Sequence, residues 1–549
     1  MALNSDAPSG LQRRGRRGAW CAAFAAALAC ACALAAANVW FGPLNHDEGW
    51  YLLAARNLSR GMAPYRDFLY TQGPALPLVY GAFAWAWAPF GVLGGRAFTA
   101  LLGMAAALLF ARSAFSLAGR SEPRAAASAA FFAFVLVALS PDWAYFSAIP
   151  KTYALGSFFL AAGFAAASGR KPRPALSGAC FALAAATRAT LCLAAPPVFA
   201  AMAVESAADR RRRFDALRFA AGCSLVLALL YVPVLAVARE NFVFSQTYHA
   251  ARAAAPLGRW LVLRAAFACF LAQGYPAVFA AAAVVAAIRP GAVSCALRPG
   301  KLLGFAVSSP VYAAIAASFV LLTAAHWLVP FPYADYNTPA MPLAAVALSV
   351  PLGRALARSR LRPGAAAAAA LALSLAFVAA SPWPMKWVGG RQDRFWFTTD
   401  SSSPLARLRE AGRALRAANP DRSPLLAQDA YLAVEADCPV VPGLEMGPFS
   451  LFPELPDSAA RERRVHNVST LAAAISGSGA RFAAVGGYTF AIQCPSTEPL
   501  DDEARSSLLA ALERAFPDIV AKWDRFGQQD APLEIRAARC APETGPGGN

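Results

Sequence analysis

The chain has 549 residues, 58% of them hydrophobic, and its 50 Lys and Arg residues outnumber its 32 Asp and Glu residues. This apolar fraction is larger than one soluble core requires. Much of the apolar surface must therefore face lipid. The basic residues lie mainly in short clusters between apolar runs, as in cytoplasmic loops beside anionic headgroups, which argues against a nucleic-acid-binding protein.

The N-terminus places a cluster of arginines at residues 13–17 before an apolar run from Ala19 to about Trp40. This run exceeds the hydrophobic part of a cleaved signal peptide, so we predict a cytoplasmic segment at residues 1–18 and a retained first span. Later basic clusters, at 120–124, 170–173, 210–213, 289–301 and 354–362, leave room for two crossings between neighbours. We therefore predict an α-helical polytopic membrane protein with about eleven spans: 19–40, 94–117, 125–140, 152–169, 174–188, 189–205, 217–238, 268–288, 302–325, 338–354 and 363–381.

Residues 41–93 form the predicted first outer loop, which ends in an apolar, Trp-rich stretch from Gly73 to Gly91. We predict that this stretch lies as a helix in the outer interface, because a span there would reverse the side of every later basic loop. A short span is the competing interpretation.

The composition changes after about Trp383, where charged residues become frequent and apolar runs shorten. This change predicts a transmembrane domain over 19–385 and a small soluble α/β domain over 386–549, with helices at 404–417 and 502–516 and strands at 424–427, 481–485 and 533–537. An odd number of spans that starts inside ends outside, so the domain is expected to be extracytoplasmic. A disulfide between two of Cys438, Cys494 and Cys540 is compatible with that side, but the spacing does not define the pair.

Two adjacent carboxylates, Asp47 and Glu48, lie where the chain leaves the first span. Loss of hydration near the hydrocarbon boundary is expected to raise the pKa of such a carboxylate, as a proton-abstracting group requires. They are the candidate catalytic residues. The alternative is that Asp47 only caps an amphipathic helix from Glu48 to Leu58.

Further along this loop, a polar and aromatic cluster is a candidate wall of a sugar or headgroup pocket, or else an interfacial anchor. It comprises Tyr65, Arg66, Asp67, Tyr70 and Gln72. Arg188 follows Thr187 where the chain turns back on the outer side. Its planar donors suit a lipid phosphate, and pairing with a loop carboxylate is the alternative.

Three other predicted outer loops carry weaker candidate residues. These are Asp142, then His249, and then His326 with Tyr333, Asp335 and Tyr336. A lone histidine is more often a hydrogen-bonded structural residue than a catalyst, so both histidines rank below Asp47. The chain has no HxxxH, paired CxxC, GxSxG or glycine-rich phosphate loop, which argues against metalloprotease, redox, serine hydrolase and ATP-driven functions.

The order of these features resembles the GT-C superfamily of membrane glycosyltransferases. The sequence has a basic N-terminus, a span, an outer Asp-Glu loop with PYRDFLYTQGP, and GGRAFTALLG opening the next span. It is most similar to the branch of protein O-mannosyltransferases, the lipid A aminoarabinose transferase and lipopolysaccharide-core sugar transferases. The resemblance covers about residues 38–200 and returns at HWLVPFPYADYNTPAMPLAAV.

The resemblance implies transfer of a sugar from a polyprenyl-phosphate donor to a lipid, glycan or protein hydroxyl, outside the cytoplasm of a bacterial inner membrane. Asp47 would be the base of a single inverting displacement, with Arg188 and Lys151 near the donor phosphate. The family tends to carry an acidic residue near the start of the fourth span, where this sequence reads AIPKTYALGSFF. Lys151 in that stretch puts a second acid and a bound divalent cation in doubt.

Two other classes of protein stay open. A transporter or lipid flippase would carry charges in mid-span, whereas the predicted spans are almost purely Ala, Leu, Val and Phe. A non-catalytic envelope assembly protein would use its outer domain to bind a partner. Sugar transfer from a polyprenyl-phosphate donor would distinguish the three.

Overall fold

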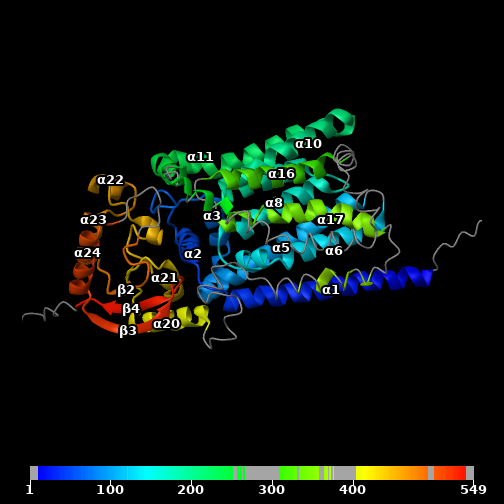
Figure 1. The fold of residues 1–549 in the computed structure, drawn as a ribbon. Coiled ribbons are helices and arrows are strands. Elements are labelled where there is room, and N and C mark those ends of the chain that lie inside the picture. Colours follow the sequence, from blue (N-terminus) through cyan, green and yellow to red (C-terminus); the bar gives the residue numbers. More distant parts are fainter. Residues whose placement is uncertain are drawn as a thin grey trace, which may run out of the picture.

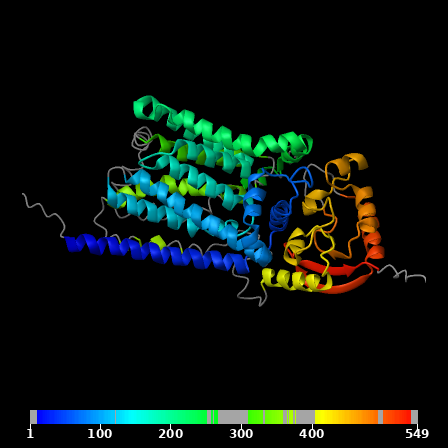
Figure 2. The same ribbon diagram turned by 180° about the vertical axis from the view of Figure 1, so that it is seen from behind.

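The computed structural model describes residues 10–119, 122–250, 309–329, 333–357, 403–491 and 500–539, with a few further residues between 256 and 375. A body of long apolar helices lies at one end of the molecule, and a smaller domain of helices and strands lies at the other (Figures 1 and 2). Short helices of the first outer loop lie between these two parts.

The helical body confirms the predicted pattern of apolar segments. Its helices are α1 (Gly10–Phe41), α5 (Gly91–Ala118), α6 (Pro123–Ala138), α8 (Thr152–Ser168), α9 (Pro174–Thr187), α10 (Ala195–Ala208), α11 (Asp215–Ala250), α16 (Pro310–Leu328) and α17 (Met341–Ala357). Five described helical segments are long and apolar enough to cross a membrane. The predicted span at 268–288, and most of the one at 363–381, lie outside the described residues.

Proline marks the starts of several of these helices. Pro123, Pro174 and Pro310 each occupy the first helical position, where the missing N–H costs nothing because that group would have no intrahelical partner. Inside α11, Ala238 leaves helical geometry (φ −148°, ψ 33°), and the predicted span ended at this residue. The kink follows Pro233, which cannot donate the helical hydrogen bond.

The stretch from Gly73 to Gly91 does not form a span of its own. It folds into α3 (Ala75–Ala82), α4 (Ala84–Trp87) and the 3₁₀ turn η1 (Ala88–Phe90), which leads directly into α5. Eight and four residues of helix are too short to cross a bilayer at 1.5 Å per residue. Its place in the membrane interface stays a prediction.

The C-terminal domain, residues 403–539, is α/β as predicted. A four-stranded sheet of order β1-β2-β4-β3 combines a parallel β1–β2 pair with antiparallel neighbours. Its strands are β1 (Leu425–Leu426), β2 (Phe482–Val485), β3 (Asp518–Phe526) and β4 (Ala531–Ala537), and its helices are α20 (Pro404–Ala418), α21 (Ala430–Ala436), α22 (Asp457–Glu462), α23 (Val468–Gly477) and α24 (Asp502–Ala515). Strand β3 was not predicted, because it is an edge strand in which Ile519 and Val520 are both half exposed and break the usual alternation.

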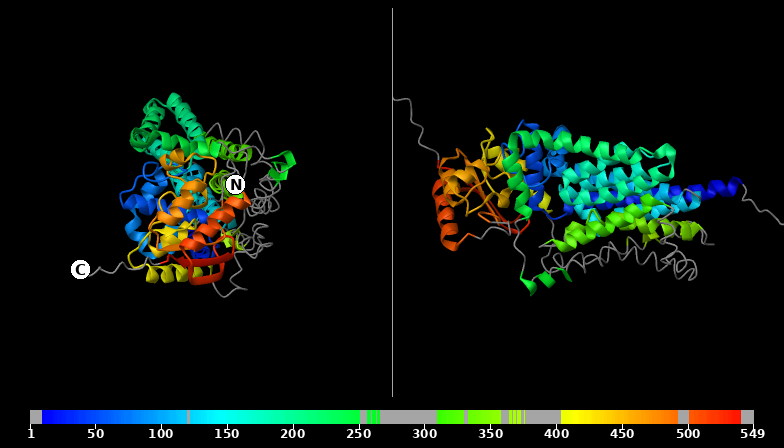
Figure 3. Two further views of the ribbon diagram at one scale, coloured as in Figure 1. Left: turned by 90° about the vertical axis from the view of Figure 1, so that its left-hand side faces the viewer. Right: turned by 90° about the horizontal axis from the view of Figure 1, so that it is seen from above.

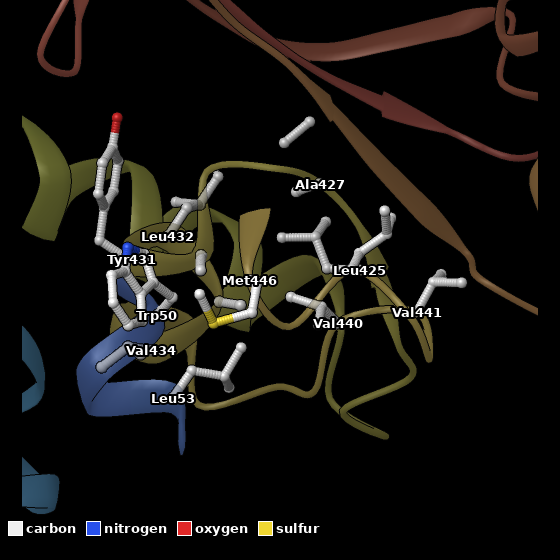
Figure 4. Close-up of a cluster of buried hydrophobic side chains, with 14 of the residues drawn as sticks. Trp50, Leu53, Leu425, Ala427, Tyr431, Leu432, Val434, Val440, Val441 and Met446 are labelled. Atoms are coloured by element: carbon white, nitrogen blue, oxygen red, sulfur yellow. The ribbon is translucent and has the colours of Figure 1, made fainter. Parts of the chain in front are cut away.

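This domain shares one hydrophobic core with α2 (His46–Ser59) of the first outer loop. In Figure 4, Trp50 and Leu53 of α2 lie against Tyr431, Leu432 and Met446 of the C-terminal domain. Gly49 permits this approach, because a Cβ on it would lie 2.2 Å from the backbone nitrogen of Tyr431. The first loop and the C-terminal domain are therefore packed as one unit, although some 370 residues separate α2 from α21 along the chain.

Arg56 of α2 stabilises the interface with the C-terminal domain through buried hydrogen bonds. Its guanidinium is buried and donates to the carbonyl oxygens of Ala433 (3.1 Å) and Cys438 (2.6 Å), and it lies 3.6 Å from Asp437. Ala433 lies in the last turn of α21 and Cys438 just beyond its end, so the arginine adds a donor at the carbonyl end of this helix.

We expect Arg56→Leu to lower the free energy of unfolding by about 1–3 kcal/mol, because it leaves the buried carbonyl oxygen of Cys438 without its donor. The measurement is thermal or denaturant unfolding of the purified protein in detergent. Arg60→Leu is the matched control: Arg60 pairs with the same Asp437 at 2.6 Å but is 41% exposed, so its loss should cost about 0–1 kcal/mol. Equal losses in the two variants would contradict the role of Arg56.

Candidate active site

A polar cluster lies where helices of the apolar body end towards the C-terminal domain. Its side chains come from the start of α2, the start of α8, the junction of α9 with the 3₁₀ turn η2 (Ala189–Ala194), and the 3₁₀ turn η4 (Ala334–Asn337) before α17. The view from above shows the dark blue helix α2 between the helical body and the C-terminal domain (Figure 3, right). The cluster therefore combines segments that are up to about 290 residues apart in sequence.

Asn45, not Asp47, caps α2. The Asn45 side chain accepts from the backbone N–H of Asp47 at 3.1 Å, and Glu48 Oε1 accepts from the backbone N–H of Asn45 at 2.8 Å. This reciprocal capping box satisfies the first donors of the helix. The alternative that Asp47 serves as the cap is wrong, because Asn45 already performs that function.

Glu48 is fully buried in an ion pair with Arg96 of α5. Arg96 Nε and Nη2 donate to the two Glu48 carboxylate oxygens at 2.6 Å each, and Arg96 also donates to the carbonyls of Val39, Gly42 and Pro43. Both Glu48 oxygens are occupied and neither is exposed. This placement argues against the catalytic role predicted for Glu48 and makes it a residue that positions the loop.

Asp47 is joined to Asp335 by a shared ammonium. Lys151 Nζ lies 2.8 Å from Asp47 Oδ2 and 2.9 Å from Asp335 Oδ2, and Tyr153 Oη donates to Asp335 at 2.8 Å. Lys151 is 7% exposed, so these charges interact with little screening by water. Two carboxylates predicted in separate loops thus meet at one cation.

The expectation that the Asp47 pKa rises is wrong. Burial alone would raise the pKa of Asp47, but the Lys151 ammonium and the neighbouring His46 hold that pKa well below its ordinary value. For Asp335, burial is likewise outweighed by Lys151, and its pKa is lowered. Both carboxylates are therefore ionised at neutral pH.

The Lys151 ammonium also bears on whether a divalent cation could bind between Asp47 and Asp335. The space between Asp47 and Asp335 is occupied by Lys151 Nζ, so a metal could bridge these carboxylates only by displacing it. Within the described part of the chain, no group of three or more His, Cys, Asp or Glu side chains is arranged to hold a metal. These residues do not fit a divalent cation as the chain stands.

Arg188 lies beside this cluster between two aromatic rings. Its Cζ is 5.0 Å from the centroid of Tyr153 and 4.6 Å from that of Tyr336, and Nη1 donates to Thr152 Oγ1 at 3.4 Å. Its Nε is buried without a hydrogen-bond partner, and no carboxylate of the described residues lies within ion-pair distance of it. The predicted alternative, pairing with a loop carboxylate, is therefore not found among those residues.

Tyr51 lies between the Asp47 end of the cluster and Arg188. It was not among the residues predicted for the site. It lies on the same face of α2 as Asp47, four residues on, and its hydroxyl lies close to Thr152, which accepts from Arg188. The i, i+4 spacing from Asp47 was the available signal. His46 was missed as well: its Nε2 lies 3.0 Å from Asp47 Oδ1.

Most of the aromatic loop cluster forms the turn after α2. Tyr65 is buried, has φ +68°, and donates to the Gln72 carbonyl at 2.5 Å. Arg66 pairs with Asp67 at 2.8 Å on the surface, and Tyr70 packs in the core against Tyr51. Tyr70 thus contacts the site through Tyr51, and a substrate-binding role for these residues stays a prediction.

The remaining predicted residues are divided among several places. Asp142 is buried in α7 (Pro141–Phe146), and Tyr333 at the start of η4 is 42% exposed. His326 is buried in α16 within 3.2 Å of Thr190 Oγ1. His249 lies in the last turn of α11. Of the predicted site residues, Asp47, Lys151, Arg188, Asp335 and Tyr336 are brought together.

The fold thus consists of a body of apolar helices, an Asp-Glu loop at one end of that body, and a C-terminal α/β domain packed on the loop. The structure is similar to the crystal structure of ArnT from Cupriavidus metallidurans in the apo state, with a TM-score of 0.57 and 15% identity over 93% of this chain and 97% of that one. It is also similar to the crystal structure of that ArnT bound to undecaprenyl phosphate (TM-score 0.54, 14% identity, 95% of this chain and 98% of that one). No protein-family model and no curated protein sequence matches the chain. At these identities the likeness shows the fold and a multi-pass membrane protein.

We expect Glu48→Gln to lower the free energy of unfolding by about 3–5 kcal/mol, because the fully buried Arg96 loses its counter-charge. The double variant Glu48→Leu/Arg96→Met removes both charges and should recover part of that loss. Denaturant unfolding of both proteins in detergent provides the comparison. A Glu48→Gln protein of wild-type stability would disprove this structural role and return Glu48 to the list of reacting groups.

Proposed function

We propose that this protein is a glycosyltransferase that moves a sugar from a polyprenyl-phosphate donor to an acceptor hydroxyl on the extracytoplasmic side of a bacterial inner membrane. The observation that carries the proposal is that Asp47 and Arg188 belong to one buried cluster. Lys151 joins Asp47 to Asp335, and Tyr153, which donates to Asp335, packs against Arg188, whose buried Nε lacks a described partner. A displacement at a sugar phosphate needs both groups: a base for the incoming hydroxyl and a cation for the departing phosphate.

Arg188 is the proposed contact of the donor phosphate. A guanidinium presents donors in a planar fork that suits phosphate oxygens, and the flanking rings of Tyr153 and Tyr336 hold the fork in place. The ArnT structure bound to undecaprenyl phosphate supports a donor of this chemical class, since that protein shares the fold. Lys151, two residues before Tyr153, adds a second cation close to the same position.

Asp47 is the proposed general base. The acceptor O–H bond breaks as its proton passes to Asp47, the acceptor oxygen bonds to the anomeric carbon, and the carbon–oxygen bond to phosphate breaks with its electron pair leaving on the phosphate. The phosphate gains one negative charge in this step, and Arg188 and Lys151 are placed to stabilise that charge. No step requires a nucleotide or a resident metal.

Lys151 makes Asp47 a weaker base at rest but keeps it ionised. The negative charge of a donor phosphate close to Lys151 would partly neutralise the ammonium. The ammonium would then lower the pKa of Asp47 less, so Asp47 would become a stronger base when the donor binds. Proton abstraction would then be coupled to the presence of a sugar donor.

The side of the membrane follows from charge distribution. The basic clusters at 170–173 and 210–213 lie at the opposite ends of α8, α9 and α10 from Lys151 and Arg188. If those clusters are cytoplasmic, the Asp47 cluster and the C-terminal domain are extracytoplasmic.

Asp47→Asn should lower transfer by about 10²–10⁴-fold while leaving binding of undecaprenyl phosphate nearly unchanged, because it removes the base and retains the shape. The assay uses purified protein in lipid vesicles with a panel of radiolabelled undecaprenyl-phosphate sugars. Asp67→Asn is the matched control, since Asp67 lies in the same loop but pairs with Arg66 on the surface, and it should retain transfer. Wild-type rates in Asp47→Asn would contradict the mechanism.

Lys151→Met should move the acid limb of the kcat/KM–pH profile to higher pH. The ammonium lowers the pKa of Asp47, so its removal raises that pKa, and the base becomes protonated at a higher pH than in the wild type. The exposed Lys171→Met serves as the control and should leave the profile unchanged. An unshifted acid limb in Lys151→Met would exclude Asp47 as the titrating base.

A further inference from the structure

The turn between β3 and β4, residues 527–530, brings a side chain of the C-terminal domain to the first residue of α2. Gln528 Oε1 lies 2.8 Å from the backbone nitrogen of His46 and 2.6 Å from His46 Nδ1. One oxygen of the C-terminal domain therefore faces both the backbone and the ring of the residue next to Asp47. Nothing in the sequence of the turn predicted this contact.

The backbone contact determines where the imidazole proton lies. A backbone N–H can only donate, so the Gln528 atom that faces it must be the carbonyl oxygen and not the amide nitrogen. The same oxygen faces Nδ1, so Nδ1 must carry a proton to make a favourable contact at 2.6 Å. Gln528 thus defines the Nδ1–H form of the ring and directs Nε2 towards Asp47.

The other ring nitrogen then requires a second proton. Nε2 lies 3.0 Å from Asp47 Oδ1, which also accepts from Trp50 Nε1 at 3.2 Å. A carboxylate oxygen at that distance attracts a protonated ring and repels a neutral nitrogen lone pair, which favours a proton on Nε2. Because Asp47 Oδ2 faces the Lys151 ammonium at 2.8 Å, the carboxylate form is favoured and the proton belongs to the ring.

The turn is held rigidly enough to perform this role. Gly527 has φ +72°, and a Cβ on it would lie 2.4 Å from Tyr431 Oη, so the turn rests directly on α21. Tyr431 donates to Asp429 at 2.8 Å, and the His46 ring packs against Tyr488, with ring centroids 5.0 Å apart. The ionisable groups that face His46 are thus Asp47, Asp429 and Tyr488, with Lys151 beyond Asp47.

The hydrogen bonds of Asp47 leave a place for the substrate proton. A carboxylate accepts about four hydrogen bonds. His46 and Trp50 occupy Oδ1 and Lys151 occupies one site on Oδ2, so among the described contacts one lone pair of Oδ2 stays open. Holding Oδ1 in this way orients Oδ2 towards an incoming hydroxyl.

We propose that Gln528 and His46 are positioning residues for the base: the C-terminal domain fixes His46 as a double donor, and His46 orients Asp47. This inference rests on the proposed function, because it assigns these residues to that reaction. It gives the C-terminal domain a direct part in catalysis. Domain and membrane body together form one site.

Nitrogen NMR of the histidine rings tests the protonation state independently of activity. The chain has four histidines, His46, His249, His326 and His466, so ¹⁵N-histidine labelling of the full-length protein in nanodiscs gives few ring signals, and His46→Asn assigns those of His46. At neutral pH we expect both His46 nitrogens to be protonated, and Asp47→Asn to leave a proton on Nδ1 alone. A neutral His46 ring in the wild type would overturn the proposal.

Kinetics test the positioning role. Gln528→Met removes the acceptor and should lower kcat roughly tenfold to hundredfold with little change in the KM of the donor, whereas Gln528→Glu retains an oxygen and should recover most of the rate. Gln529→Met is the matched control, because Gln529 is the next residue of the turn and is exposed. Equal rates in Gln528→Met and Gln529→Met would overturn the role of Gln528. A wild-type protein that transfers no sugar would instead disprove the proposed function, and the His46 spectrum would still decide the protonation state.

Discussion

The contact on which the site depends is the buried Lys151 ammonium between two carboxylates. Asp47 and Asp335 lie on segments far apart in the sequence, and each meets Lys151 Nζ within 2.9 Å. Removing the cation would leave two like charges facing each other with little water to screen them, so the start of α2, the start of α8 and the turn before α17 hold one another in place. The same contact keeps Asp47 ionised and leaves Arg188 to interact with an anion.

A second constraint is the shared core of α2 and the C-terminal domain. Glu48 and Arg96 fix the start of α2 against the helical body, and Arg56 fixes its end against α21. Asp47 therefore lies on a short helix that is held from both sides, which suits a group that must meet a substrate with fixed geometry. The Gln528 contact extends this arrangement from packing to the orientation of the proposed base.

The outcome for individual residues shows where sequence reasoning reached its limit. Asp47 and Arg188 were singled out because charged groups are costly near hydrocarbon wherever the rest of the chain lies. The pKa of Asp47 was predicted in the wrong direction because burial could be inferred from the sequence, whereas the proximity of Lys151 could not. The Tyr65–Gln72 stretch looked like a pocket wall, but its aromatic rings pack inward and its charges pair on the surface.

The sequence by itself determined the membrane class, the apolar helices and the α/β character of the C-terminal part. These follow from hydropathy and periodicity, since lipid imposes a minimum length and an apolar composition on each span irrespective of what it packs against. Only the tertiary structure decided that Asn45 caps α2, that Lys151 joins Asp47 to Asp335, and that Gln528 reaches His46. Such contacts join residues hundreds of positions apart, and no local pattern specifies which distant side chains will meet.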